Sequence, residues 1–346
     1  MKKVVEVETK KAHDQYLMNL FDDENTEDHE GRGCKRLWSY IKALKRDIVG
    51  VSPLDHMGKL VTSGEHRAQA LSDQYEGVFT MEDLTKIPYK GSSPFTSMKT
   101  IIVTIPGVEK LLNKLNPKKA LGPDLLPTTI IKDNADILAP ILTKIFQQSL
   151  DSGDVPTDWT LANVSAIFKK GNRCSPSNYR PVSLTCVICK VLEHIIFRNI
   201  MDHCDLNQIL NDFQHGFRTR HSCESQLINT VEELARNLDH KKQTDCIILD
   251  FSKAFDTVPH QRLLYKLRYY GIKDNTLKWI DHWLTSRMQT VVVDGSKSKD
   301  VHVKSGVPQG TVLGPLLFLL YINDIADKTH SQIKLFADDC ILFHVV

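Results

Sequence analysis

The sequence has no hydrophobic run of membrane length, no signal peptide, and no cysteine spacing typical of a disulfide framework. These absences exclude a membrane-spanning protein and a small secreted scaffold held together by disulfides. The eight cysteines are scattered over 346 residues. We therefore expect reduced thiols in a soluble, intracellular protein that has no membrane partner.

The sequence also lacks the paired motifs of a structural zinc site. Cys186-Val-Ile-Cys189 is a CxxC pair, but no second pair follows it, and a zinc site needs four ligands. His194, His203 and Cys204 lie nearby in the sequence. Because residues 181–201 are largely apolar and predict a helix, we expect these cysteines to lie in the core.

Net charge is low, at +2, but it is unevenly distributed. Residues 1–30 hold four basic and nine acidic residues, whereas residues 165–220 hold eight basic and four acidic residues. A local excess of positive charge favours a nucleic-acid partner over a small neutral substrate. Ordinary solvated lysines are the alternative that charge alone leaves open.

Two adjacent acids, Asp338 and Asp339, interrupt an apolar, β-prone run at residues 333–343. On a regular strand, neighbouring side chains point to opposite faces, so one of the acids would enter the core. A buried carboxylate is costly unless it has a partner. The run therefore predicts a hairpin whose turn presents both acids to a divalent metal, with a solvated surface turn as the alternative.

A second apolar run, at residues 246–249, ends on another acid, Asp250. Two-metal phosphoryl transfer uses a few carboxylates to hold two ions roughly 4 Å apart. Mg²⁺ prefers such sparse carboxylate ligation, completed by water and phosphates. An acid at the end of one strand beside a two-acid turn on the next would supply these ligands.

Several motifs occur together in a fixed order. The principal three are Asp250-Phe-Ser-Lys-Ala-Phe-Asp256, Ser305-Gly-Val-Pro-Gln-Gly310 and Phe336-Ala-Asp-Asp339. Four lie upstream: Leu121-Gly-Pro-Asp124, Ile167-Phe-Lys-Lys-Gly171, Asn178-Tyr-Arg-Pro-Val-Ser183 and Gln214-His-Gly-Phe-Arg218. In order and in amino-acid sequence they resemble the reverse transcriptase motifs of non-LTR (LINE-type) retrotransposons, in the jockey-like and chicken-repeat-like groups. The resemblance is clear over residues 100–346 and weaker over residues 31–100.

The resemblance implies an α+β fold: the fingers and palm of a right-hand polymerase, with an antiparallel sheet backed by helices. It implies four regions: an acidic disordered N-terminus at 1–30, a connector with helices and a linker at 31–100, fingers and the start of the palm at 101–243, and the palm with its catalytic motifs at 244–346. The thumb that follows the palm in relatives is absent, so we expect an exposed apolar edge on the final strand. No endonuclease precedes the connector, so a separate endonuclease is expected among the partners.

The resemblance also implies roles for individual residues. Asp250, Asp338 and Asp339 would be catalytic and would bind two Mg²⁺ ions, with Mn²⁺ as an alternative. The implied nucleotide-binding residues are Lys169, Lys170, Arg180, Phe251, Phe255, Gln309 and Gly310, and Arg218 would contact the template. Phe251 would lend a backbone carbonyl, and Phe255 would exclude a ribose 2′-hydroxyl, with a core phenylalanine as its alternative.

Two residues within these motifs have other possible roles. A surface ion pair is the alternative for Arg218, and Asp256 is predicted to cap the helix that begins near Pro259.

The implied function is RNA-directed DNA polymerase, or reverse transcriptase, acting on an RNA template, a DNA primer and dNTPs. The family implies a location in the cytoplasm and nucleus. Two alternatives remain open: a truncated remnant that binds nucleic acid without polymerising, and a related palm polymerase or maturase.

Periodicity and breakers predict the individual elements. Helices are predicted at 35–49, 62–79, 108–115, 128–150, 186–201, 223–238, 259–270, 274–286 and 311–322. Strands are predicted at 159–168, 245–250, 289–294 and 300–304. A hairpin is predicted at 333–345 and a linker at 80–100.

Overall fold

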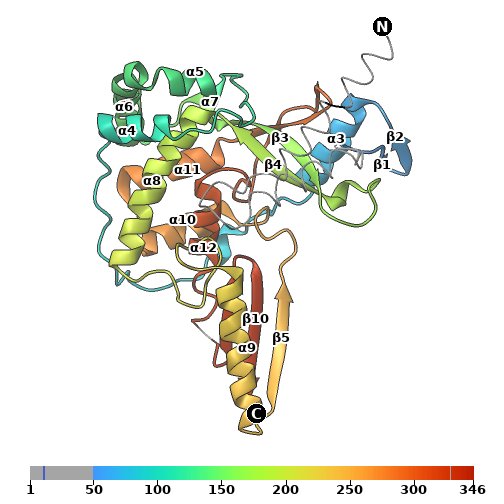
Figure 1. Cartoon of the computed structure of the whole chain (residues 1–346), viewed down its shortest axis with the longest axis vertical. Helices are drawn as coiled ribbons and strands as arrows, with labels where there is room; N and C mark the ends of the chain where they lie inside the picture. The colour runs from blue at the N-terminus through green and yellow to red at the C-terminus, as the bar shows by residue number, and fades with distance from the viewer. Residues whose placement is uncertain (1–10, 12–49, 328) are drawn as a thin grey trace. The chain divides into compact units, whose positions relative to one another are not determined.

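The computed structural model describes residue 11, residues 50–327 and residues 329–346 (Figure 1). The chain divides into two units after Ser52, and within the described residues every helix and strand with assigned bounds belongs to the second, Pro53–Val346. Apart from Lys11, the segments 1–30 and 35–49 lie outside the described residues, and so do the predictions made for them.

A three-stranded antiparallel sheet carries the acidic hairpin. β9 (Gln332–Phe336) and β10 (Asp339–Val345) form the predicted hairpin, and β5 (Thr244–Asp250) pairs with the other side of β10. The final strand is therefore the middle strand, and the expectation that it has an exposed apolar edge is wrong. The apolar exposure lies on the edge strand β5, where Ile247 and Ile248 are 59% and 78% exposed.

A second sheet has the order β4-β3-β6-β7, with β8 also pairing with β6. Its strands are β3 (Leu161–Phe168), β4 (Tyr179–Thr185), β6 (Met288–Val293), β7 (Ser296–Lys297) and β8 (Val301–His302). The sheet that carries the acidic hairpin is antiparallel, as expected of this α+β fold, whereas β3 and β6 in the second sheet run parallel. The predicted helix start at residue 181 is also wrong, because Pro181 lies in the edge strand β4, where a missing N–H is tolerated.

Helices make up most of the remaining structure. They are α3 (Gly64–Glu76), α4 (Ile105–Asn113), α5 (Thr128–Asp133), α6 (Ala135–Ser152), α7 (Thr157–Thr160), α8 (Val187–Leu206), α9 (Cys223–Asp239), α10 (His260–Tyr269), α11 (Asp274–Thr285) and α12 (Leu313–Ile322). Smaller elements are the hairpin β1 (Leu54–His56) and β2 (Lys59–Val61), and the 3₁₀ turns η1 (Leu84–Lys86) and η2 (Pro176–Asn178). The single helix predicted at 128–150 is two helices, because Asn134 leaves the helical region between α5 and α6.

The main core lies among α8, α10, α11 and α12 and extends to α4–α6. α12 is apolar around its whole circumference and almost entirely buried, as expected of a helix inside a core. Trp279 and Trp283 of α11 are fully buried and stack with ring centroids 6.2 Å apart. Each fully buried large side chain of this kind contributes roughly 1.5–3 kcal/mol.

Cys186 and Cys189 are buried in this core, as predicted. Burial, helped by a hydrogen bond with Asp124, raises the pKa of the Cys186 thiol to about 12. Burial also raises the pKa of Cys189 well above its ordinary value. Both cysteines therefore lie in the core as apolar side chains.

Residues 80–100, predicted to be a linker, have little regular structure but are fixed to α10. The Glu82 carboxylate accepts hydrogen bonds from the backbone N–H groups of Gln261 and Arg262, at 3.0 and 2.9 Å. These are free donors in the first turn of α10, whose own N-cap, Pro259, has no side-chain hydrogen bond to offer. Glu82 therefore caps a helix that is far from it in sequence.

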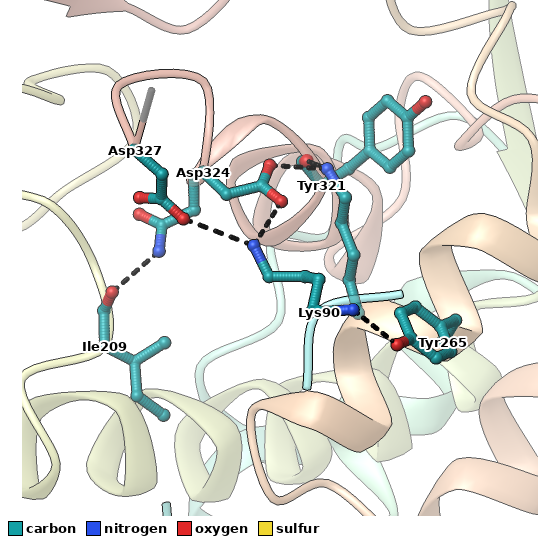
Figure 2. A network of polar contacts seen from close by, with 8 residues as sticks. Lys90, Ile209, Tyr265, Tyr321, Asp324 and Asp327 are labelled. Atoms are coloured by element: carbon teal, nitrogen blue, oxygen red, sulfur yellow. Dashed lines mark hydrogen bonds and ion pairs between the residues drawn. The ribbon is translucent and has the colours of Figure 1, made fainter. Parts of the chain in front are cut away.

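Lys90 makes a second attachment (Figure 2). Its Nζ lies 2.6 Å from Asp324 and 3.3 Å from Asp327, both just after α12. Lys266 of α10 reaches the other oxygen of Asp324 at 2.5 Å. The backbone N–H of Lys90 also donates to the Tyr265 hydroxyl of α10. Residues 80–100, α10 and the segment after α12 therefore meet around the Asp324 carboxylate.

In the part of the chain that the structure describes, no helix combines the length and apolarity needed to cross a membrane.

Candidate active site

The turn between β9 and β10 presents Asp338. Because Phe336 pairs with Asp339, the turn has only two residues, Ala337 and Asp338. Two-residue hairpins require positive φ, and Ala337 has φ +56°, which is disfavoured for a residue with a Cβ atom. The predicted hairpin is confirmed, with Asp338 in the turn and Asp339 opening the second strand.

Asp250 lies beside this turn, because its register partner on β10 is Asp339. Like charges directly opposite on paired strands destabilise each other. Among the described residues, none of Asp250, Asp338 and Asp339 forms an ion pair with a basic side chain. This concentration of uncompensated negative charge suits a divalent cation.

The donor set fits one kind of metal site. No group of three or more His, Cys, Asp or Glu within the described residues is arranged to hold a metal unaided. Mg²⁺ in phosphoryl-transfer sites takes one or two carboxylates and completes its shell with water and substrate phosphates. Asp250 and Asp338, which line the same cavity, fit that pattern and not a cage made only of protein ligands.

One cavity of about 550 Å³ collects most of the predicted site residues, and its volume is typical of ligand pockets. Its lining includes Asp250, Asp338, Lys169, Lys170, Arg180, Phe251, Phe255, Gln309 and Gly310. These residues come from β5 and the segment that follows it, the β9–β10 turn, the β3–β4 turn, β4 and the loop before α12.

Two predicted residues lie outside the lining of this cavity, Asp339 and Arg218. The Arg218 guanidinium donates to the Asn211 carbonyl at 2.9 Å and lies 3.6 Å from Asp212. The surface ion pair considered as its alternative is therefore present. The template contact stays a prediction for Arg218, and the catalytic role stays one for Asp339.

The lining of the cavity also includes a cationic group. Lys169 and Lys170 follow β3, Arg180 lies in β4, and all three side chains are exposed. The Lys169 N–H donates to Asn178 across the turn, which keeps the three cations together. Lys253, not singled out from the sequence, donates to the Ser177 carbonyl and joins this turn to the segment after Asp250. Acids and cations that line one cavity match the charges of a metal-bound triphosphate.

Phe255 both lines the cavity and packs on the core. Its ring stacks on Phe318 of α12 at 4.2 Å between centroids, and Phe217 meets it edge-on at 6.2 Å. Exclusion of a ribose 2′-hydroxyl and packing in the core are thus compatible roles for Phe255. Phe217, 55% exposed with φ +54°, is a cavity residue that sequence reasoning did not single out, although it lies in the Gln214–Arg218 motif.

Gln309 is hydrogen-bonded to Asp256, for which the sequence predicted a different role. Its Nε2 donates to the Asp256 carboxylate at 3.1 Å, and its carbonyl accepts from the Ser183 N–H at 2.7 Å. The prediction that Asp256 caps α10 is wrong, because the N-cap is Pro259 and Glu82 occupies the free donors. Burial raises the pKa of Asp256, and the hydrogen bond from Gln309 opposes that shift.

The start of α12 is capped by a side chain from another helix. The fully buried Glu193 carboxylate of α8 accepts from the N–H groups of Val312 and Leu313, at 2.7 and 3.3 Å. Gly310, with φ +97°, lies so close to Ser183 that a Cβ atom would be 2.7 Å from its carbonyl oxygen. The close approach that this glycine allows is therefore to the chain's own backbone.

Comparison with known proteins places the chain in a family. It belongs to the reverse transcriptase (RNA-dependent DNA polymerase) family, whose model matches residues 167–345. Within that family its domain is of the non-LTR, LINE-type class, as the motifs indicated.

The similar relatives are insect mobile-element proteins. The chain is 33% identical over 254 residues to the RNA-directed DNA polymerase from mobile element jockey of Drosophila melanogaster, covering 73% of this chain and 27% of that protein. For the jockey protein of Drosophila funebris the identity is 33% over 227 residues, covering 65% and 25%. For the probable RNA-directed DNA polymerase from transposon BS of Drosophila melanogaster it is 27% over 336 residues, covering 89% and 36%. The chain thus spans about a quarter to a third of the length of these relatives.

Proposed function

We propose that this chain catalyses RNA-directed DNA synthesis, adding a dNTP to the 3′-hydroxyl of a primer paired with an RNA template. The observation that carries the proposal is the single cavity lined by Asp250, Asp338, three finger cations, Phe255 and Gln309. The names of the jockey and BS relatives support the same activity. Residues 101–243 are proposed as fingers and the start of the palm, and residues 244–346 as palm.

Each wall of the cavity has a distinct task. Asp250 and Asp338 would hold divalent metal, proposed as two Mg²⁺ ions with Asp339 as a weaker contributor. When bound, the metal would acidify the primer hydroxyl and neutralise charge on the departing pyrophosphate. Arg180 can grip phosphate oxygens bidentately, with Lys169 and Lys170 adding charge.

The other two walls select the nucleotide. Phe255 is backed by Phe318 and cannot retreat into the core, so it would collide with a ribose 2′-hydroxyl. Gln309, fixed by Asp256 and Ser183, would contact the incoming nucleotide from the opposite loop.

The test is primer extension on an RNA template with Mg²⁺ and either dNTPs or rNTPs. Asp250→Ala and Asp338→Ala should abolish extension, whereas Asp245→Ala should retain it. Asp245 is a matched control because it lies on the same strand as Asp250 and outside the cavity.

Three results would contradict the proposal. Equal extension by wild type and the two cavity variants would exclude the metal-ligand assignment. A preference for rNTPs would indicate an RNA-copying RNA polymerase. Binding of the primer–template hybrid without extension by the wild type would indicate a nucleic-acid-binding domain that does not polymerise.

A further inference from the structure

The turn that carries Asp338 is held by one buried side chain, Gln214. Its Oε1 accepts a hydrogen bond from the Ala337 N–H at 2.8 Å, and its Nε2 donates to the Ala337 carbonyl at 3.2 Å. Gln214 is 2% exposed and Ala337 is 6% exposed. The amide group therefore satisfies both backbone groups of the residue immediately before Asp338, where water has little access.

The two hydrogen bonds from Gln214 act on the hairpin residue with the least favourable backbone conformation. Ala337 has positive φ, which an alanine adopts only when its surroundings hold it there. A two-residue turn fixes the directions of its side chains through these backbone angles. Relaxation of Ala337 would therefore turn the Asp338 carboxylate away from Asp250.

The segment around Gln214 is itself attached to the hairpin. Gln214 forms a parallel bridge with Leu335, and the His215 N–H donates to the Leu335 carbonyl at 2.9 Å. Gly216 donates to the same Oε1 of Gln214 at 2.7 Å. A Cβ atom on Gly216 would lie 2.2 Å from the Ala337 nitrogen, so only glycine permits this contact.

We propose that Gln214 is a positioning residue that fixes the Ala337–Asp338 turn in the geometry required for metal binding, an inference that rests on the proposed function of this cavity. It does not line the cavity and acts through the backbone of Ala337. Residues that orient metal ligands typically affect metal affinity or activity about 10–100-fold.

The chain offers a matched control in Gln226. It is also a buried glutamine, 7% exposed, and its Nε2 donates to the Phe213 and Leu335 carbonyls at 2.9 and 3.0 Å. It thus attaches α9 to the same strand without contacting Ala337. Gln214→Met and Gln226→Met each remove buried hydrogen bonds near the hairpin, and only the first releases the turn.

Three readouts test the assignment. In Gln214→Met we expect kcat to fall about 10–100-fold, because the variant disturbs the orientation of a metal ligand. Mn²⁺ binding, followed by electron paramagnetic resonance with Asp338→Ala as the zero point, should weaken about 10-fold. The Ala337 amide hydrogen should exchange about 10-fold faster than in the wild type, because its acceptor is gone. Gln226→Met should match the wild type in all three.

A second variant guards against misfolding. Gln214→Glu keeps an acceptor for the Ala337 N–H but has no donor for its carbonyl, so its kcat and Mn²⁺ affinity should lie between those of wild type and Gln214→Met. Equal losses in Gln214→Met and Gln226→Met, or unchanged Mn²⁺ binding and Ala337 exchange in Gln214→Met, would overturn the proposal. Mn²⁺ binding and amide exchange need no primer extension, so they decide the role of Gln214 even if the wild type does not polymerise.

Discussion

The carboxylate of Asp324 joins three segments, and its replacement by asparagine gives a direct measure of what holds them together (Figure 2). In the native chain its two oxygens lie 2.6 Å from Lys90 and 2.5 Å from Lys266. Asp324→Asn keeps the shape of the side chain and removes its charge. Two ammonium groups would then face each other with Asp327 as their remaining acidic neighbour among the described ion pairs.

The expected loss follows from burial. The side chains of Lys90, Asp324 and Lys266 are only 16%, 18% and 20% exposed, so water screens them poorly. Removing one member of a buried ion pair costs about 3–5 kcal/mol, and a single charge-assisted hydrogen bond contributes about 1.5–3 kcal/mol. Solvent reaches part of the site and the asparagine carbonyl can still accept a hydrogen bond, so part of the lost stability is recovered. We therefore expect Asp324→Asn to lower the free energy of unfolding by about 2–4 kcal/mol.

Urea unfolding followed by circular dichroism measures this loss, with Asp327→Asn as the matched control. Asp327 is 57% exposed and, among the described ion pairs, reaches only Lys90, at 3.3 Å, so its replacement should cost about 0–1 kcal/mol. Equal losses in the two variants would show that burial of the network does not determine its strength, and would refute the reasoning.

The same network predicts a pH dependence. Burial raises the pKa of Asp324, but hydrogen bonds from Lys266 and Lys90 outweigh this effect and hold the pKa below its ordinary value. A lowered carboxyl pKa contributes stability that is present above the unfolded pKa, about 4, and is lost as the pH falls through the folded value. The difference between wild type and Asp324→Asn should therefore be constant from about pH 5 to about pH 7 and shrink below about pH 4. A difference that grows on acidification would contradict the assignment.

Two further predictions concern the proposed nucleotide site. Phe255→Val should raise the kcat/KM for rNTPs relative to dNTPs by about 10–200-fold, because the ring that blocks a 2′-hydroxyl is lost, and an unchanged ratio would exclude the gate. Arg180→Lys should raise the dNTP KM about 10-fold, because the charge remains but the bidentate grip is lost. Arg173→Lys, in the turn that precedes β4 and outside the cavity, is the control and should leave KM unchanged.

Local patterns in the sequence were enough to predict the hairpin, its acids and most helices. The apolar runs on either side of Asp338-Asp339 predict a hairpin with the acids at its turn, and β9 and β10 form that hairpin, with Asp338 in the turn and Asp339 opening β10. The same holds for α12, which was predicted to begin at residue 311 and begins at Leu313, because the uniformly apolar run after Gly310 has to be buried. Both features depend on neighbours within a few residues.

The partners of buried polar groups were decided only by the tertiary structure. Asp256 was assigned to the helix that follows it in sequence, but its partner is Gln309, fifty-three residues away. In the same way, α10 receives its cap from Glu82, and α12 receives its cap from Glu193. A buried donor or acceptor must be satisfied by whichever group the fold brings to it, and no local period or turn signal encodes that group. The sequence alone therefore predicted most of the side chains that line the cavity, and the tertiary structure determined which side chains hold them in place.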